Sequence, residues 1–262
     1  MFTWKKKTLG GLMACLICLW SCTSVLPVSA ETSAGTAAFV RRFSVDASTH
    51  VPVSLPSPPA GISARGAVLM EAESGDVIYG QNQNARLPMA STTKIMTALV
   101  ALEALSPHER ITVTAESVGI EGSSVYLCEG EILTLEELLY ALLLASANDA
   151  ATAIAIAVSG SVEAFAERMN AKAAELGLTD THFVNPHGLD DPNHYTTALE
   201  LALLTREALS HPLIREICAT RKKTIPLHGE EGVRLLVNHN RLLSSLEGCI
   251  GVKTGYTKKT GR

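Results

Sequence analysis

Three short motifs follow one another along the chain, and together they contain the groups that serine-based acyl transfer requires. They read Ser91-Thr92-Thr93-Lys94, Ser146-Ala147-Asn148 and Lys253-Thr254-Gly255. A Ser and a Lys at this spacing carry little weight alone, since both residues are common. The ordered set of three is far more specific, and it predicts an enzyme.

The first motif pairs a nucleophile with a base. Residues three apart on a helix share a face, so the Lys94 amine can reach the Ser91 hydroxyl. Apolar residues recur at helical spacing after Lys94 and predict that Ser91 lies in the first turn of a buried helix. Lysine, with an ordinary pKa of about 10.4, is a poor base at neutral pH. Burial and a second cation can lower it, and Lys253 is the candidate cation.

Each motif also has a reading without catalysis. Ser91 alone could cap a helix, Lys94 could be a solvated side chain, and residues 146–149 could form a turn between helices. The order of the motifs and their flanking residues favour the catalytic interpretation.

The flanks carry a family resemblance. They are LPMASTTKIMT at 87–97, SANDA at 146–150, NPHGLDDPNHYTTA at 185–198 and GVKTGYT at 251–257. These segments resemble the low-molecular-mass D-alanyl-D-alanine carboxypeptidases of peptidase family S11, which are penicillin-recognising serine enzymes. The resemblance runs from about residue 65 to 262. It implies a hydrolase that removes the terminal D-alanine from peptidoglycan stem pentapeptides through an acyl-enzyme on Ser91, binds β-lactam antibiotics, and needs neither cofactor nor metal.

The same resemblance assigns the other site residues. Ser146 and Asn148 would line the cleft and assist proton transfer and substrate holding. Lys253 and Thr254 would meet the substrate carboxylate, and Gly255 would allow close backbone approach. The backbone N–H groups of Ser91 and Tyr256 would form the oxyanion hole.

Two rival functions remain beside the carboxypeptidase. A class A-like β-lactamase would need a glutamate for deacylation, usually in an ExxLN motif, which we do not find; its second motif would also read SDN rather than SAN. A non-catalytic module that binds β-lactam or muropeptide is the other rival.

A cluster in the third flank could suggest a metal site. It comprises His182, His187, Asp190, Asp191 and His194. The spacing matches no helical metal motif, and the prolines and glycine among these residues predict a turn-rich loop, so we reject the metal interpretation. We expect His187 and Asp190 to shape the rim of the cleft.

The N-terminus predicts export. Residues 1–30 have the lysines, the apolar run and the small-residue end of a signal peptide, with cleavage after Ala30. A membrane anchor would need a longer run, and lipoprotein processing at Cys22 is a less suitable alternative. Residues 31–61 are a Pro-, Ser- and Ala-rich linker. Residues 62–262 form the catalytic domain of an enzyme that works in the cell envelope, outside the cytoplasm.

Composition limits the partners and the stabilising chemistry. The chain has 262 residues, 47% of them hydrophobic, and a net charge of -4, which suits one sizeable core and offers no basic surface for nucleic acid. Only Cys128, Cys218 and Cys249 follow the signal peptide, so a disulfide framework is not expected.

Patterning predicts an α+β domain. We expect a hairpin over 67–79, helices at 135–145 and 198–209 that begin with capping boxes, and a third helix from Ser161 to Gly177. Strands are predicted at 222–227, 233–238 and 250–254. This order suits the penicillin-binding, β-lactamase-like transpeptidase fold, in which a helical cluster packs on an antiparallel sheet. Because the sheet of that family continues past the third motif, we also expect a chain truncated there, without its C-terminal strands, helix and any region for peripheral membrane association.

Overall fold

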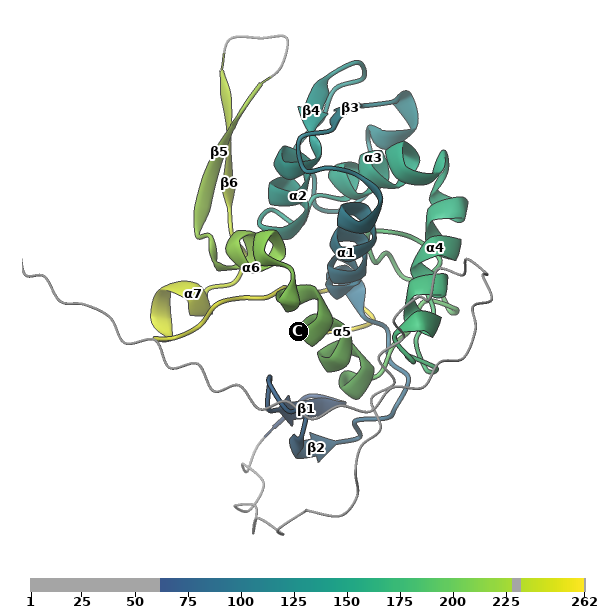
Figure 1. Ribbon diagram of the computed structural model, residues 1–262, viewed down its shortest axis with the longest axis vertical. Coiled ribbons are helices and arrows are strands. Elements are labelled where there is room, and N and C mark those ends of the chain that lie inside the picture. Colours follow the sequence, from purple (N-terminus) through teal and green to yellow (C-terminus); the bar gives the residue numbers. More distant parts are fainter. Residues whose placement is uncertain (1–61, 228–231, 262) are drawn as a thin grey trace, which may run out of the picture. The chain divides into compact units, whose positions relative to one another are not determined.

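The described part of the chain, residues 62–227 and 232–261 of the computed structural model, contains seven α-helices, two 3₁₀ helices and three pairs of antiparallel strands (Figure 1). The predicted signal peptide and linker lie outside the described residues. Among those residues no single helix is long and apolar enough to cross a membrane, and one bent helix pair meets that test by length and composition only.

The helix that follows the first motif lies among the other helices. This helix, α1 (Lys94–Ala104), contacts α2 (Leu135–Leu143), α3 (Asn148–Ser159), α4 (Val162–Glu175) and α5 (Ala198–Ser210) (Figure 1). The first two turns of both α1 and α3 are buried. Alanines along α3 leave room for neighbouring helices to approach closely. The polar residues that begin these two helices, Lys94 and Asn148, are therefore held inside the protein.

The predicted helix starts depend on side-chain caps. Thr134 forms a complete capping box with Glu137 at the start of α2, and Ser161 caps α4, as predicted. Thr197 accepts a hydrogen bond from the Glu200 backbone N–H at the start of α5. The other half of the predicted capping box, a hydrogen bond from the Thr197 backbone N–H to the Glu200 carboxylate, is wrong. That carboxylate instead accepts hydrogen bonds from the backbone N–H of Asp180 and the hydroxyl of Thr181. Two partners from another segment outcompete the local one.

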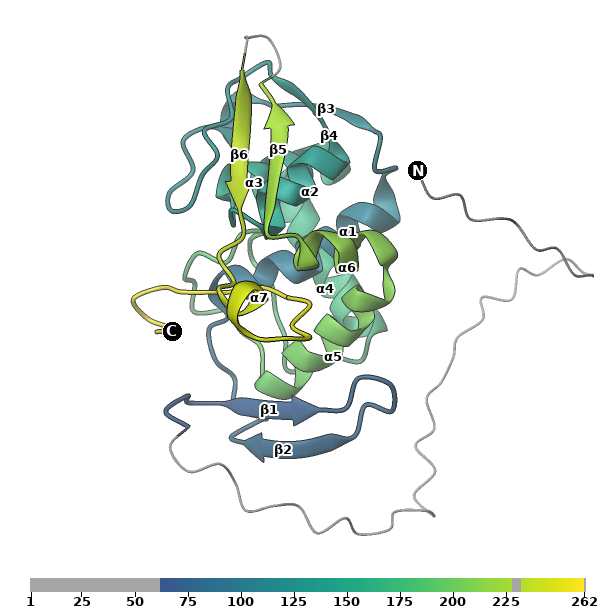
Figure 2. The same ribbon diagram turned by 90° about the vertical axis from the view of Figure 1, so that its left-hand side faces the viewer.

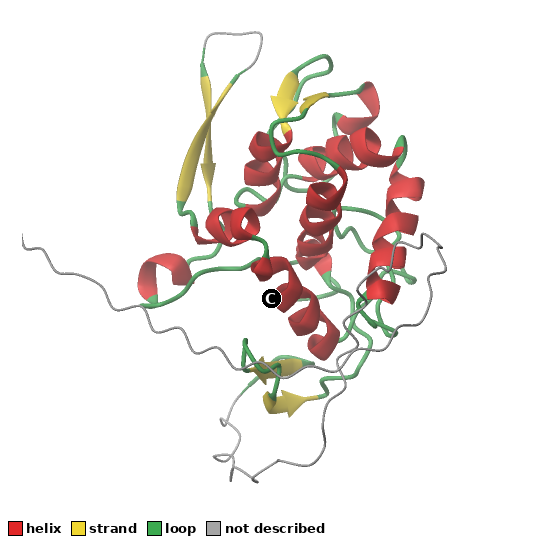
Figure 3. Cartoon of the chain, viewed as in Figure 1, coloured by secondary structure: helices red, strands yellow, loops and turns green. Residues whose placement is uncertain are grey.

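The strands pair in three separate two-stranded antiparallel sheets, at the margins of the helical cluster in Figure 3. Their pairs are β1 (Ala67–Met70) with β2 (Val77–Gln81), β3 (Arg110–Thr112) with β4 (Ile132–Thr134), and β5 (Lys222–Pro226) with β6 (Val233–Val237). The α+β prediction is confirmed, as are the first hairpin and the strands near 222 and 233.

The strand predicted at 250–254 is wrong. No described segment pairs with these residues, and a strand exists only through the ladder of hydrogen bonds to a neighbour. The Gly251 carbonyl instead accepts a hydrogen bond from the Asn240 side chain, 2.9 Å away. Two short helices lie in this C-terminal half, α6 (Pro212–Ala219) and α7 (Leu242–Ser245).

A buried ion pair joins the β5–β6 hairpin, whose arrows show their broad faces in Figure 2, to the helical part. Arg234 of β6 places both guanidinium nitrogens on the Glu131 carboxylate, at 2.5 and 2.9 Å. It also donates to the carbonyls of Val125 and Tyr126. Each guanidinium nitrogen of Arg234, in an otherwise apolar strand, thereby donates at least one hydrogen bond. These bonds hold the loop before β4 in place.

Candidate active site

The nucleophile of the first motif lies in a short 3₁₀ turn, η1 (Ala90–Thr93), which runs directly into α1. The first helical turn predicted for Ser91 is of the 3₁₀ kind, which also places residues i and i+3 on one face. The Lys94 amine nitrogen lies 3.2 Å from the Ser91 hydroxyl oxygen. The motif's two reactive groups are in hydrogen-bond contact.

Two further oxygens surround the Lys94 amine. The nitrogen lies 2.7 Å from the Asn148 side-chain oxygen and 2.6 Å from the His187 carbonyl. The Asn148 amide nitrogen donates to the Glu121 carbonyl, which fixes which end of the side chain faces the lysine. The Lys94 side chain is fully buried. The first and second motifs thus meet at this amine.

The surroundings favour the neutral form of Lys94. Burial, together with the positive charge of Lys253, holds the pKa of Lys94 well below its ordinary value, while Asp149 acts in the opposite direction. The Asp149 carboxylate accepts hydrogen bonds from the Ser124 hydroxyl and from the backbone N–H of Val125 and Leu127. The Asp149 carboxylate is therefore held by these hydrogen bonds, and among the described residues no ion pair between Lys94 and a carboxylate is found.

The third motif reaches the second through Lys253. The Lys253 amine donates to the Ser146 hydroxyl at 3.0 Å and to the Thr254 carbonyl at 2.9 Å. Burial lowers the pKa of Lys253 to about 8. Ser146 is buried and has a left-handed backbone, with φ of 61°, a conformation that is uncommon outside glycine. The hydroxyl is thus held between α2 and α3, facing the third motif.

Gly255 lies against the nucleophile turn. A Cβ atom built on it would be 3.3 Å from the Ser91 backbone nitrogen and 3.2 Å from the Met89 carbonyl oxygen. Any side chain there would crowd the backbone of η1. The next residue, Tyr256, is 59% exposed. A pocket of about 300 Å³ opens beside this contact, and its lining includes Ala90, Thr92 and Gly255.

Three residues of the rejected metal cluster contact the motifs or their flanks. The His187 backbone meets Lys94, the His194 ring meets the Thr93 hydroxyl at 2.7 Å, and the Asp190 carboxylate accepts from Thr257 at 3.0 Å. Within residues 62–227 and 232–261, no three His, Cys, Asp or Glu side chains come close enough to hold a metal ion.

The sequence did not predict three features of the site: the hydrogen bonds of Thr93, the buried carboxylate of Asp149 and the contact of His194 with Thr93. Asp149 had a usable signal, because an acidic residue directly after Asn148 at the start of an apolar helix has few reasons to be buried other than hydrogen bonding. The Thr93 contact carries no such signal, since it joins positions 101 residues apart.

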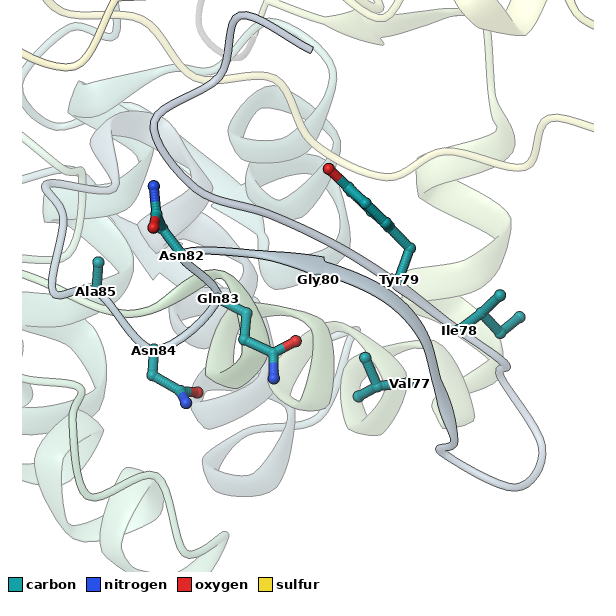
Figure 4. Close-up of a pocket in the computed structure, with 8 residues that line it drawn as sticks. All are labelled: Val77, Ile78, Tyr79, Gly80, Asn82, Gln83, Asn84 and Ala85. Atoms are coloured by element: carbon teal, nitrogen blue, oxygen red, sulfur yellow. The ribbon is translucent and has the colours of Figure 1, made fainter. Parts of the chain in front are cut away.

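A second pocket, of about 560 Å³, is built from β2 and the turn that follows it (Figure 4). Its lining runs from Val77 to Ala85 and contains the amide side chains of Asn82, Gln83 and Asn84. No residue of the three motifs takes part in it. The chemistry therefore belongs to the site around Ser91.

Comparison with known proteins identifies relatives of this arrangement. Residues 53–262 match the family model described as D-alanyl-D-alanine carboxypeptidase. The chain is 40% identical over 199 residues to the D-alanyl-D-alanine carboxypeptidase DacF of Bacillus subtilis (strain 168), a match that covers 74% of this chain and 51% of that relative. The chain therefore spans about half the length of this curated relative.

Solved structures share the fold. The D-alanyl-D-alanine carboxypeptidase of Mycobacterium tuberculosis H37Rv superimposes with a TM-score of 0.72 at 36% identity, covering 79% of this chain and 76% of that one. The Streptomyces K15 DD-transpeptidase gives a TM-score of 0.72 at 31% identity, covering 79% of this chain and 84% of that one. The predicted transpeptidase fold is confirmed.

Proposed function

Because the chain belongs to the D-alanyl-D-alanine carboxypeptidase family of serine peptidases, S11, we propose that it removes the terminal D-alanine from peptidoglycan stem peptides through an acyl-enzyme on Ser91. The observation that carries this proposal is the buried Lys94 amine in contact with the Ser91 hydroxyl, with its pKa held low. β-Lactams would acylate the same serine.

The hydrogen bonds of Lys94 support its role as the base. A neutral amine has two N–H donors and one lone pair. The two nearer oxygens, of the Asn148 side chain and the His187 carbonyl, can only accept hydrogen bonds. They therefore occupy both N–H donors of the amine. The lone pair is then directed at the third partner, the Ser91 hydroxyl, whose proton it can take as the oxygen attacks the substrate carbonyl.

The remaining motif residues provide binding and proton return. The Lys253 ammonium, together with the Thr254 side chain, would hold the terminal carboxylate of the substrate. Ser146, whose hydroxyl accepts a hydrogen bond from Lys253, would pass a proton to the departing D-alanine amine. The backbone N–H groups of Ser91 and Tyr256 would stabilise the oxyanion, a contribution of a few kcal/mol per donor. Water then hydrolyses the ester and releases the shortened peptide.

The setting of this reaction is also part of the proposal. The substrate is a cell-wall peptide, so the enzyme would act outside the cytoplasmic membrane, as the signal-like sequence of residues 1–30 suggests.

The test uses the full chain and its Ser91→Ala variant. Each is incubated with a peptide ending in D-Ala-D-Ala, and free D-alanine is measured; each is also exposed to benzylpenicillin and followed by intact mass. We expect D-alanine release and a slowly lost adduct, both absent from the variant. Rapid penicillin turnover would instead indicate a β-lactamase, and an adduct without D-alanine release would indicate a binding module.

A further inference from the structure

The backbone just before the nucleophile is strained. Ala90 has a φ of 46°, in the left-handed region, and is almost completely buried. For a residue with a Cβ atom this conformation costs roughly 1–2 kcal/mol, and it persists only where surrounding contacts impose it. Ala90 therefore needs partners that hold it.

A chain of three hydrogen bonds ends on the Ala90 carbonyl. The Val184 backbone N–H donates to Nδ1 of His194 at 3.1 Å, Nε2 of His194 lies 2.7 Å from the Thr93 hydroxyl, and that hydroxyl donates to the Ala90 carbonyl at 2.7 Å. A backbone N–H can only donate, so Nδ1 carries no proton and Nε2 carries the ring's single hydrogen. The direction of every bond is thereby determined.

The His194 ring, through which these hydrogen bonds run, is held firmly in place. His194 is 2% exposed, and Phe183 packs against it edge to face, with ring centroids 5.8 Å apart. Burial lowers the pKa of His194 to about 4, so the ring is neutral at physiological pH, as these hydrogen bonds require. Gly188 closes the other side, because a Cβ built on it would lie 1.9 Å from the Ala90 carbonyl oxygen.

The carbonyl of Ala90 and the N–H of Ser91 belong to one peptide group. In a planar trans peptide these two bonds point in opposite directions, so fixing the carbonyl also aims the N–H. Gly255 of the third motif lies near that nitrogen. We propose that His194, acting through Thr93, orients the Ser91 N–H as an oxyanion donor and is thus a positioning residue for acylation. This inference rests on the proposed function.

The kinetic test compares His194→Ala with His194→Gln in the full chain. A glutamine amide can accept from Val184 and donate to Thr93, as the ring does, whereas alanine can do neither. Loss of an oxyanion donor costs about 10²–10³-fold. We therefore expect His194→Ala to lower the first-order acylation rate by benzylpenicillin roughly 10–100-fold with little change in the preceding binding constant, and His194→Gln to recover most of it.

Two controls separate positioning from folding. His182→Ala removes a histidine of the same segment that bonds the Asn193 carbonyl, and it should acylate at nearly the normal rate. Where His194→Ala does not fold, Thr93→Val and Thr93→Ser test the same link, since only serine keeps the hydroxyl. Folded His194→Ala or Thr93→Val chains that acylate normally, or a His194→Gln chain as slow as the alanine variant, would overturn the proposal.

NMR spectroscopy tests, without any measurement of catalysis, the hydrogen-bond relay from His194 through Thr93 to the Ala90–Ser91 peptide group. Long-range ¹H–¹⁵N correlation of the His194 ring at pH 7 should show the neutral, Nε2-protonated tautomer, and the Ser91 amide resonance should move in His194→Ala but much less in His194→Gln. An Nδ1-protonated or charged ring, or an unmoved Ser91 amide, would reject the relay. A wild-type chain that forms no adduct but passes these measurements would remove the proposed function and leave the backbone relay standing.

Discussion

Ser91 and Lys94 lie on helical turns whose neighbours are nearly all buried, whereas Lys253 lies in a segment with no helix or strand, in which the following residues Thr254 and Tyr256 are exposed. Lys94 has three polar partners, Ser91 on the turn before it and Asn148 and His187 from two other segments of the chain. The segment 250–257 is held by a few contacts, such as Asn240 on the Gly251 carbonyl.

This difference separates two tasks of the site. The groups that make and break bonds need fixed geometry and buried surroundings, and the helical core supplies both. The groups that meet the substrate lie where it can enter. Changes on the nucleophile side should therefore reduce the chemical step or the fold, and changes on the Lys253 side should mainly alter substrate affinity.

The largest expected effect comes from replacing the base. Lys94→Met keeps a buried, unbranched side chain but removes the group that takes the Ser91 proton. We expect acylation by benzylpenicillin, measured by intact mass, to slow on the order of 10³-fold.

The matched control is Lys172→Met, which removes a lysine whose ion pairs, with Glu103 and Glu175, involve no residue of the motifs. Its acylation rate should stay near that of the wild type. A Lys94→Met chain that melts normally and still acylates within about tenfold of the wild-type rate would contradict the assignment of the base.

Glycine replacement tests how tightly the nucleophile side is packed. Gly188→Ala places a Cβ 1.9 Å from the Ala90 carbonyl oxygen at a φ of +91°, so steric overlap adds to backbone strain. We expect a loss of about 3 kcal/mol in the free energy of unfolding, measured with denaturant.

Alanine substitutions at two other glycines serve as comparisons for the loss of stability in Gly188→Ala. Gly119→Ala meets nothing within 4 Å at a φ of +74°, so only the backbone strain of about 1 kcal/mol should remain. Gly255→Ala, on the Lys253 side, meets atoms at 3.2 to 3.3 Å, which small shifts can relieve. Equal losses for Gly188→Ala and Gly119→Ala would show that the nucleophile turn is not tightly enclosed.

Acid should weaken the nucleophile side through its buried histidine. The unfolded His194 binds a proton near pH 6.5, but the folded one does so only near pH 4, so between these values the unfolded state holds more protons. Stability contributed by this group is present above pH 6.5 and is lost as the pH falls toward 4, by up to about 3 kcal/mol.

Comparison with His194→Gln isolates this contribution. Asp190, Asp191, His182 and Lys94 also act on the His194 ring, and they remain in the variant. Its free energy of unfolding should therefore fall less steeply between pH 6.5 and 4 than that of the wild type. Parallel pH curves for the two proteins would mean that His194 does not stay neutral in the fold.

Local sequence signals predicted the helical side well and the other side poorly. Thr134 with Glu137, and Ser161, marked helix starts correctly because a cap depends on residues three or four positions away. The predicted strand at 250–254 failed because pairing depends on a distant segment, which the described residues do not supply.

The candidate site shows the same division. The spacing of Ser91 and Lys94 foretold their contact, since it is local. The contact of His194 could not be predicted from the sequence, because the hydroxyl to which it hydrogen-bonds lies 101 residues earlier in the chain. Ordered motifs reveal which residues meet, and tertiary contacts decide what positions them.

The smallest effect, and the one that most directly tests the comparison, is expected for Lys253→Met. Loss of the ammonium should raise KM for a D-Ala-D-Ala peptide about 10–30-fold, the size expected for one charged contact to a carboxylate, with a smaller change in kcat. Steady-state release of D-alanine at pH 7 measures both constants. Lys259→Met, an exposed lysine of the same segment, should leave both near the wild-type values.

The pH dependence of KM and of the acylation rate provides a second, independent test of the role of Lys253. Lys253 loses its charge above a pKa of about 8, so wild-type KM should rise above that pH, whereas the variant, with no charge to lose, should show no such rise. Lys253 also depresses the pKa of Lys94, so its removal should shift the acidic limb of the acylation profile to higher pH. If Lys253→Met instead lowered kcat about as much as Lys94→Met does and left KM unchanged, Lys253 would belong with the chemistry, and the separation of the two sides would be wrong.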